Sequence, residues 1–218
     1  MKRRVLLYVL VAAMAAALGI VATHAEAADP VQMITVRAAS STSTTAVLEA
    51  WQRPVTGGAY VRMHAPIFAR VGAQGVGQAR EGRAVTPVGR FGLTEAYGRL
   101  ANPGTTVPYK VLDWSDWWDG DSNSAAYNQH VRCGGTVHCP FDPAQSERLM
   151  AFVPSYNYLV VINYNRWPAV RYAGSAFFLH VENGQATGGC VAVSQVDMIW
   201  LLRWLKKAYY PIIQISVG

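Results

Sequence analysis

The sequence predicts a mostly-β domain closed by one α-helix near its C-terminus. Three observations support this prediction: β-branched and aromatic residues recur in short runs, glycine- and proline-rich segments separate these runs, and only one stretch keeps a helical period. The chain has 218 residues, which suits a single domain with a hydrophobic core.

The first 27 residues are typical of a secretory signal peptide. Lys2, Arg3 and Arg4 form a basic start, an apolar stretch covers residues 5–22, and Ala25-Glu26-Ala27 places small residues where a signal peptidase reads the chain. Left uncleaved, the apolar stretch is long enough to span a membrane, so anchoring is the alternative. We expect cleavage and export to the cell wall or a periplasm-like space, with no membrane attachment afterwards.

The exported chain carries a mild positive charge. The formal charge is +6 for the whole sequence and becomes +4 once Lys2, Arg3, Arg4 and Glu26 are removed. Such a charge favours residence near an anionic polymer such as a bacterial wall. No basic cluster with interleaved aromatic residues occurs, so we expect no nucleic-acid partner.

Strand signals run through most of the chain. The first two runs are separated by "ASSTSTT", which predicts a hairpin connection, with a flexible linker as the alternative. A glycine-rich loop covers residues 72–89, and residues 100–148 are rich in loop-forming residues. The predicted strands are residues 31–38, 46–53, 59–72, 90–98, 156–165 and 174–181.

One helix is predicted after residue 193. Ser194 followed three residues later by Asp197 is typical of a helix N-terminus. Lysines complement the helix dipole near the end, and Pro211 stops the helix. Its apolar positions recur at helical spacing at Val196, Ile199, Leu202 and Leu205.

The chain has three cysteines, and exported proteins tend to hold cysteines as disulfides. Cys133 and Cys139 flank a short glycine-bearing loop, so we expect a disulfide between them, which leaves Cys190 free. A zinc site of His130, Cys133, His138 and Cys139 is one alternative, although the usual ligand spacings are absent, and two free thiols are the other.

The segment "DWWDGDSNS" resembles a calcium loop only in its alternating acidic residues. Ser124 stands where the glycine of such a loop belongs, and His130 stands where its bidentate glutamate belongs. We therefore expect no metal.

The strongest chemical signal lies in "FFLHVENGQATGGCVAV", residues 177–193. Strand alternation places Phe178 and His180 on one face of the strand and Leu179 on the other. A lone histidine at the end of a hydrophobic strand is most often a core residue. Cys190 follows ten residues later, directly behind Gly188 and Gly189. A neighbouring imidazole can take a thiol proton, and glycine backbone freedom allows N–H groups to face a developing oxyanion. We therefore predict Cys190 as nucleophile, His180 as base, and the backbone of Gly188 and Gly189 as part of an oxyanion hole.

These residues resemble the signature of the L,D-transpeptidases (the YkuD domain), which runs from a histidine to a Gly-Cys motif. "TPVGRF", residues 86–91, resembles the upstream Thr-Pro-x-Gly-x-Phe element of that family. The resemblance implies a β-sandwich or barrel-like catalytic domain over residues 47–218. Residues 28–46 then form an N-terminal strand and hairpin connection.

The resemblance also implies an exported enzyme of peptidoglycan that needs no cofactor. Cys190 would form a thioester with a tetrapeptide stem and release D-alanine, and the amine of a second stem would then give a 3→3 cross-link. The partners are thus a tetrapeptide donor and an amine acceptor, and we expect a monomer.

The sequence departs from the family at several positions. Thr187 and Gly188 precede Gly189 where the family commonly has a Ser-His pair, Ala192 occupies the place of an arginine, and the spacing from histidine to cysteine is short. Hydrolysis by an L,D-carboxypeptidase is therefore one alternative. A sortase-like transpeptidase using His130 and Arg203, and a non-catalytic wall-binding module, are the others.

Two further predictions concern the surroundings of the site. Tyr164 and Trp167 lie shortly before the His180 strand and are candidates for substrate contacts, although core or loop anchoring is the alternative. The segment 109–128 is a candidate lid.

Overall fold

The computed structural model describes residues 29–218. The predicted signal peptide and its cleavage site lie outside the described residues. Within residues 29–218, no helix combines the length and the apolar character that crossing a bilayer requires.

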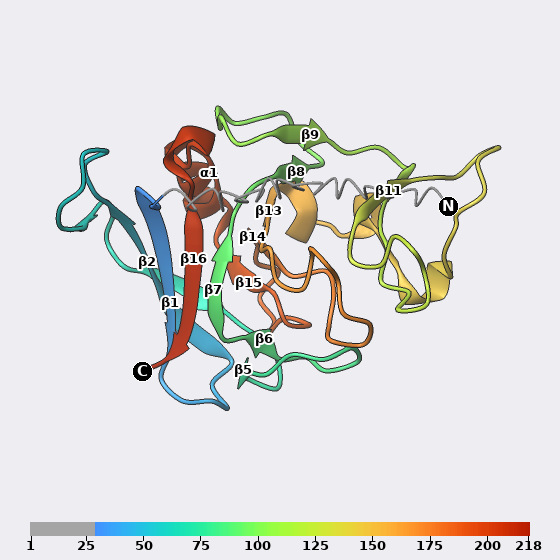
Figure 1. The fold of residues 1–218 in the computed structure, drawn as a ribbon, viewed down its shortest axis with the longest axis horizontal. Helices are drawn as coiled ribbons and strands as arrows, with labels where there is room; N and C mark the ends of the chain where they lie inside the picture. Colours follow the sequence, from blue (N-terminus) through green and yellow to red (C-terminus); the bar gives the residue numbers. More distant parts are fainter. Residues whose placement is uncertain (1–28) are drawn as a thin grey trace, which may run out of the picture.

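An eleven-stranded sheet, curled into a half-barrel, forms the frame of the domain. The long strands β1, β2 and β16 lie on one side of the molecule, and the yellow-green and yellow segment around β11 lies on the opposite side (Figure 1). The predicted mostly-β class with one helix near the C-terminus is confirmed. In spatial order the sheet contains β7 (Gly89–Gly92), β16 (Ile212–Val217), β1 (Gln32–Ala38), β2 (Thr45–Gln52), β4 (Ile67–Arg70), β15 (Val191–Val193), β14 (Phe178–Val181), β13 (Leu159–Val161), β8 (Ala96–Gly98) and β9 (Tyr109–Val111), with β3 (Val61–Arg62) paired to β2.

Within the described residues, two small sheets and five helical segments complete the fold. The elements are a three-stranded sheet of β11 (His130–Arg132), β10 (Asp116–Trp118) and β12 (Glu147–Arg148), a ladder of β5 (Val76–Gly77) and β6 (Thr86–Pro87), the helix α1 (Gln195–Trp204), and the 3-10 helices η1 (Pro143–Gln145), η2 (Leu149–Ala151), η3 (Ser155–Asn157) and η4 (Lys207–Tyr209).

The predicted hairpin is confirmed at the start of the domain. β1 and β2 pair antiparallel along their whole length, from Gln32 opposite Gln52 to Ala38 opposite Ala46. The flexible-linker alternative is therefore wrong. Gln32 is buried because its side-chain amide donates to the carbonyl of Trp204 (2.7 Å) and accepts from the amide of Lys206 (2.8 Å), which ties β1 to the end of α1.

Several predicted strands are shorter than the sequence pattern indicated. The run 59–72 gives only β3 and β4, separated by a segment that contains Pro66, and the run 156–165 pairs only at β13. Proline removes a ladder donor, which explains the first interruption.

The last strand, β16, was not predicted. It pairs parallel to β1 and antiparallel to β7, so it closes the sheet between two distant segments. Apolar and polar residues alternate in its sequence at Ile213, Gln214 and Ile215. The structure follows this alternation, since Ile213 and Ile215 are buried whereas Gln214 is exposed. The interpretation of Pro211 as the end of the last element concealed it.

The helix α1 begins as predicted. The Ser194 hydroxyl accepts from the amide of Asp197 (3.1 Å) and donates to its carboxylate (2.6 Å). The helix ends at Trp204, and its inward side is formed by Met198, Leu201 and Leu202. Val196 is 79% exposed, so its assignment to the apolar stripe was wrong.

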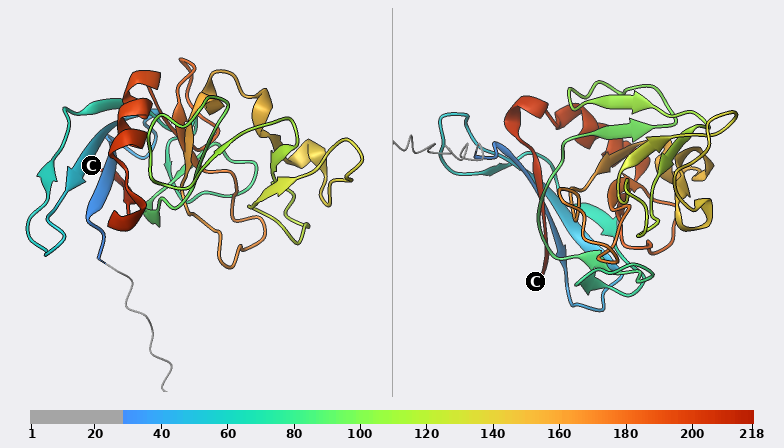
Figure 2. Two further views of the ribbon diagram at one scale, coloured as in Figure 1. Left: turned by 90° about the horizontal axis from the view of Figure 1, so that it is seen from above. Right: turned by 45° about the vertical axis from the view of Figure 1, so that its right-hand side comes forward.

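The main sheet separates two hydrophobic clusters. The larger cluster lies between the sheet and α1 and contains the inward residues of β1, β2 and β16. The smaller cluster lies on the other face, beneath the three-stranded sheet, and contains Trp118, Tyr156, Phe178 and Cys190. Figure 2 shows α1 and this second sheet at separate places on the molecule.

The predicted disulfide is present in the loop after β11. Cys133 and Cys139 are bonded, with their Cα atoms 5.1 Å apart. Both sulfurs are thereby used, so the zinc alternative has lost its thiolate ligands.

Candidate active site

Cys190 and His180 lie on two neighbouring parallel strands. His180 belongs to β14, and Cys190 immediately precedes β15, in which Ala192 is the Cα partner of His180. Side chains alternate along a strand, so His180 shares the face of Phe178, which packs in the same cluster as Cys190. Both residues line one pocket of about 280 Å³, here called the thiol pocket, together with Glu147, Tyr156, Thr187 and Gly188.

The imidazole of His180 is buried and neutral. Its Nδ1 lies 2.8 Å from the carbonyl oxygen of Val181. A carbonyl only accepts, so Nδ1 carries the proton and Nε2 keeps a free lone pair. Burial lowers the pKa of His180 to about 4, although the hydrogen bond to Val181 opposes this shift. At neutral pH the side chain is therefore an unprotonated base.

The thiol of Cys190 is also buried and neutral in this state. Burial raises its pKa far above the ordinary value, the charge of Glu147 adds to this effect, and the amide of Phe178 opposes it. Sγ accepts a hydrogen bond from the Phe178 amide and donates one to the Ala176 carbonyl, both at 3.3 Å. Neither bond involves the imidazole, so the resting pocket holds a neutral thiol and a neutral imidazole that are not hydrogen-bonded to each other.

The turn before Cys190 requires glycine. Gly189 has a φ of +138°, and a Cβ there would lie 2.7 Å from a ring carbon of Phe177. The Gly189 amide donates to the hydroxyl of Thr187 (3.1 Å), and that hydroxyl donates to the carbonyl of Cys190 (2.7 Å). Among residues 29–218, the amides of Gly188 and Cys190 make no turn or side-chain hydrogen bond. These two amides, rather than that of Gly189, are the candidate oxyanion donors.

Thr86 connects the upstream element to the backbone of Cys190. Its fully buried hydroxyl accepts from the amide of Gly72 (2.8 Å) and donates to the carbonyl of Cys190 (3.1 Å). Gly89 has a φ of +145° and lies against the ring of Phe91. The Thr-Pro-x-Gly-x-Phe element thus fixes the backbone on which Cys190 sits.

A second pocket of about 310 Å³ adjoins the thiol pocket. It shares Glu147, Ser175, Ala176 and Gly188 with the thiol pocket, and Arg80 and Arg83 also line it, so it is here called the arginine pocket. Sequence reasoning missed Glu147 completely. Its surroundings, "AQSERLM", give no local signal, and only the pairing of β12 with β10 brings it to the site.

The comparison with protein families agrees with this geometry. The model of the YkuD L,D-transpeptidase catalytic domain matches residues 44–213, which is most of the chain. The chain belongs to the L,D-transpeptidase family. Neither the curated proteins nor the solved structures compared with the chain gave a match.

In this L,D-transpeptidase domain, Ala192 lies between two larger side chains. Its Cα partners are His180 on β14 and Arg70 on β4. Arg70 forms an ion pair with Glu182, with Nε 2.6 Å from the carboxylate. A guanidinium therefore lies on the strand beside Ala192, although none projects from position 192 itself.

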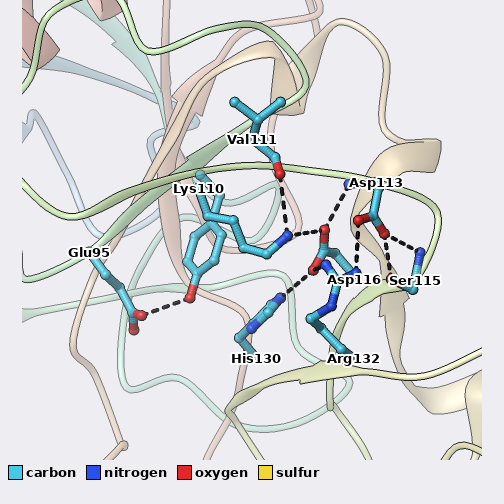
Figure 3. Close-up of polar contacts among 9 residues, drawn as sticks. Glu95, Lys110, Val111, Asp113, Ser115, Asp116, His130 and Arg132 are labelled. Atoms are coloured by element: carbon cyan, nitrogen blue, oxygen red, sulfur yellow. Dashed lines mark hydrogen bonds and ion pairs between the residues drawn. The ribbon is translucent and has the colours of Figure 1, made fainter.

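The histidine and arginine of the sortase-like alternative are used elsewhere in the L,D-transpeptidase domain. His130 lies 2.8 Å from the buried carboxylate of Asp116, which also accepts hydrogen bonds from Lys110 and Arg132 (Figure 3). Arg203 donates to the carbonyl of Pro103 (2.9 Å). Neither His130 nor Arg203 lines the thiol pocket.

The candidate substrate contacts lie outside both pockets. The Tyr164 hydroxyl donates to the carbonyl of Ala173 (2.9 Å), and its ring packs against Phe91 and Phe177, so it anchors the core. Trp167 is 64% exposed and lines neither pocket. Of the candidate lid, residues 109–128, Trp118 and Gly120 line the arginine pocket.

Proposed function

We propose that this chain is an exported L,D-transpeptidase that acts on peptidoglycan stem peptides through a thioester on Cys190. The observation that carries the proposal is a buried thiol and an imidazole with a free Nε2 lone pair in one pocket, next to two unengaged amides. Export is supported by the leader-like pattern of residues 1–27.

In the first half-reaction, the thiol proton passes to Nε2 of His180 while Sγ attacks the carbonyl carbon of the stem bond. The oxyanion that forms on the carbonyl oxygen accepts hydrogen bonds from the amides of Gly188 and Cys190. The C–N bond then breaks, and the proton on Nε2 goes to the leaving nitrogen, which departs as D-alanine. Proton transfer is coupled to attack because the resting site holds no ion pair and burial disfavours a free thiolate.

In the second half-reaction, an acceptor cleaves the thioester and restores the thiol. An amine acceptor gives a cross-link, whereas water gives a shortened stem. The same acyl-enzyme precedes both products, so the acceptor decides between transpeptidase and carboxypeptidase activity.

Intact-protein mass spectrometry tests the proposal. The chain without residues 1–27 is incubated with a disaccharide-tetrapeptide, with Cys190→Ala and His180→Ala as variants. We expect an adduct on the unsubstituted protein together with released D-alanine, and no adduct on either folded variant. Full activity of His180→Ala would contradict the mechanism, and a folded protein that forms neither adduct nor product would favour a wall-binding module.

A further inference from the structure

Glu147 occupies the junction of the two pockets. It lies on β12 opposite Trp118 and is one of the four residues that line both the thiol pocket and the arginine pocket. The Tyr156 hydroxyl donates to its Oε2 (2.5 Å). The mechanism above gives this carboxyl group no role.

No cation of the described residues neutralises Glu147. None of the ion pairs within residues 29–218 includes it. The adjacent Arg148 points away, since its guanidinium stacks on Trp114 and Trp117. A shielded carboxylate without a cationic partner is unfavourable, so the site is suited to a cationic group of a ligand.

The charge of Glu147 is unhelpful in the first half-reaction. A negative charge near Cys190 opposes formation of the thiolate, and it contributes to the raised pKa of that thiol. A carboxylate at this place is useful once the thiol has been acylated, because an incoming ammonium ion then meets an opposite charge beside the thioester.

The arginine pocket has room and charge for that incoming group. Cationic and anionic side chains border this cavity, since Arg80, Arg83, Glu81 and Glu147 all line it. A ligand with an ammonium and a carboxylate on the same carbon atom complements this arrangement, with its ammonium at Glu147 and its carboxylate at the arginines.

We propose that the arginine pocket is the acyl-acceptor site, in which Glu147 binds the attacking ammonium group and takes its proton. This rests on the proposed function, because it assigns a residue to the second half-reaction. One ammonium proton passes to the carboxylate of Glu147, and the neutral amine attacks the thioester carbon. A C–N bond forms and the C–S bond breaks. The surplus proton on nitrogen passes through Nε2 of His180 to Sγ, and Glu147 returns its proton to solvent.

The titration of Glu147 suits this role. Burial raises its pKa to about 7, the hydrogen bond from Tyr156 lowers it, and the charge of Glu81 raises it. The other ionisable groups that border the two pockets are Arg80, Glu81, Arg83, Tyr156, His180 and Cys190. A carboxyl group that titrates near neutral pH both accepts and releases a proton under working conditions.

The deciding variant is Glu147→Gln, which keeps the shape and the hydrogen bond from Tyr156 but removes the charge. Glu49→Gln, on β2 and away from both pockets, is the matched control. With a tetrapeptide donor and a tripeptide acceptor that carries a free amine next to a carboxylate, we expect acylation of Glu147→Gln within about threefold of the unsubstituted protein, but a loss of amine transfer of about 100-fold. Glu147→Asp should recover part of the transfer and its rise with pH near 7. Equal transfer by Glu147→Gln would overturn the proposal.

A binding measurement separates this proposal from the proposed function. Cys190→Ala, with and without Glu147→Gln, is titrated with the same acceptor tripeptide by calorimetry. We expect the acceptor to bind about tenfold or more weakly when Glu147 is replaced by Gln. An acceptor peptide without the carboxylate next to its amine should bind more weakly to both protein variants. If no acyl-enzyme ever forms but binding depends on Glu147, the acceptor site stands and the proposed function fails. Equal affinity of the two proteins would refute the acceptor site whatever acylation shows.

Discussion

The buried side chain of His180 makes the unfolding free energy of this protein depend on pH, and the substitution His180→Gln should remove that dependence. His180→Gln keeps a side chain of similar size but has no group that titrates between pH 4 and 7. In the folded chain the pKa of His180 is about 4, against 6.5 as its ordinary value. Between these values the unfolded chain binds a proton that the folded chain does not, so acidification favours unfolding.

The magnitude follows from the difference of about 2.5 pKa units. At 1.36 kcal/mol for each unit, the unsubstituted protein should lose about 3 kcal/mol of unfolding free energy between pH 7 and pH 4 through this residue alone. The loss is absent above pH 6.5 and complete below pH 4. Other groups titrate in both proteins, so the quantity of interest is the difference between the two proteins.

Urea unfolding followed by tryptophan fluorescence at several pH values measures this difference. We expect the gap in unfolding free energy between the unsubstituted protein and His180→Gln to change by about 3 kcal/mol over the range. His64→Gln is a matched control, since the Nδ1 of His64 also meets a backbone carbonyl, that of Ala65 at 2.9 Å, but at the surface. Parallel curves for the unsubstituted protein and His180→Gln would refute the assignment of a neutral, buried imidazole.

Three further substitutions test the scaffold of the site. Asp116→Asn removes the carboxylate that Lys110, His130 and Arg132 share (Figure 3) and should lower the unfolding free energy by about 3 kcal/mol in urea titrations; an unchanged midpoint would contradict this. Thr86→Val removes the hydrogen bonds to Gly72 and Cys190 and should cost about 2 kcal/mol and slow adduct formation; normal acylation would show that the hydroxyl does not position the nucleophile. Gly189→Ala forces a side chain into a left-handed backbone and should reduce acylation about tenfold or more in mass spectrometry, and an adduct formed at the normal rate would count against the turn geometry.

Local features of the chain were readable because their causes are local. The hairpin of β1 and β2, the Ser194 cap of α1 and the Cys133–Cys139 bond each depend on residues within a few positions of one another. Alternation also placed His180 on the face of Phe178, because a strand turns successive side chains to opposite sides.

Long-range pairing decided what the pattern did not reveal. The strand β16 lies between β1 and β7, and its own sequence does not indicate which strands it pairs with. Likewise, the Tyr164 side chain looked like a groove residue by its place in the sequence, but its ring packs against Phe91 from a distant strand.

The sequence by itself determined the family, the class of fold, and the candidate nucleophile and base, since these depend on residue type and short spacing. The tertiary structure alone decided the state of these groups. Burial keeps His180 neutral and the thiol of Cys190 protonated, and the pairing of β12 with β10 places Glu147 between the two pockets. Desolvation and proximity are sums over residues from the whole fold, so the chemistry of the site is set by packing that no local pattern contains.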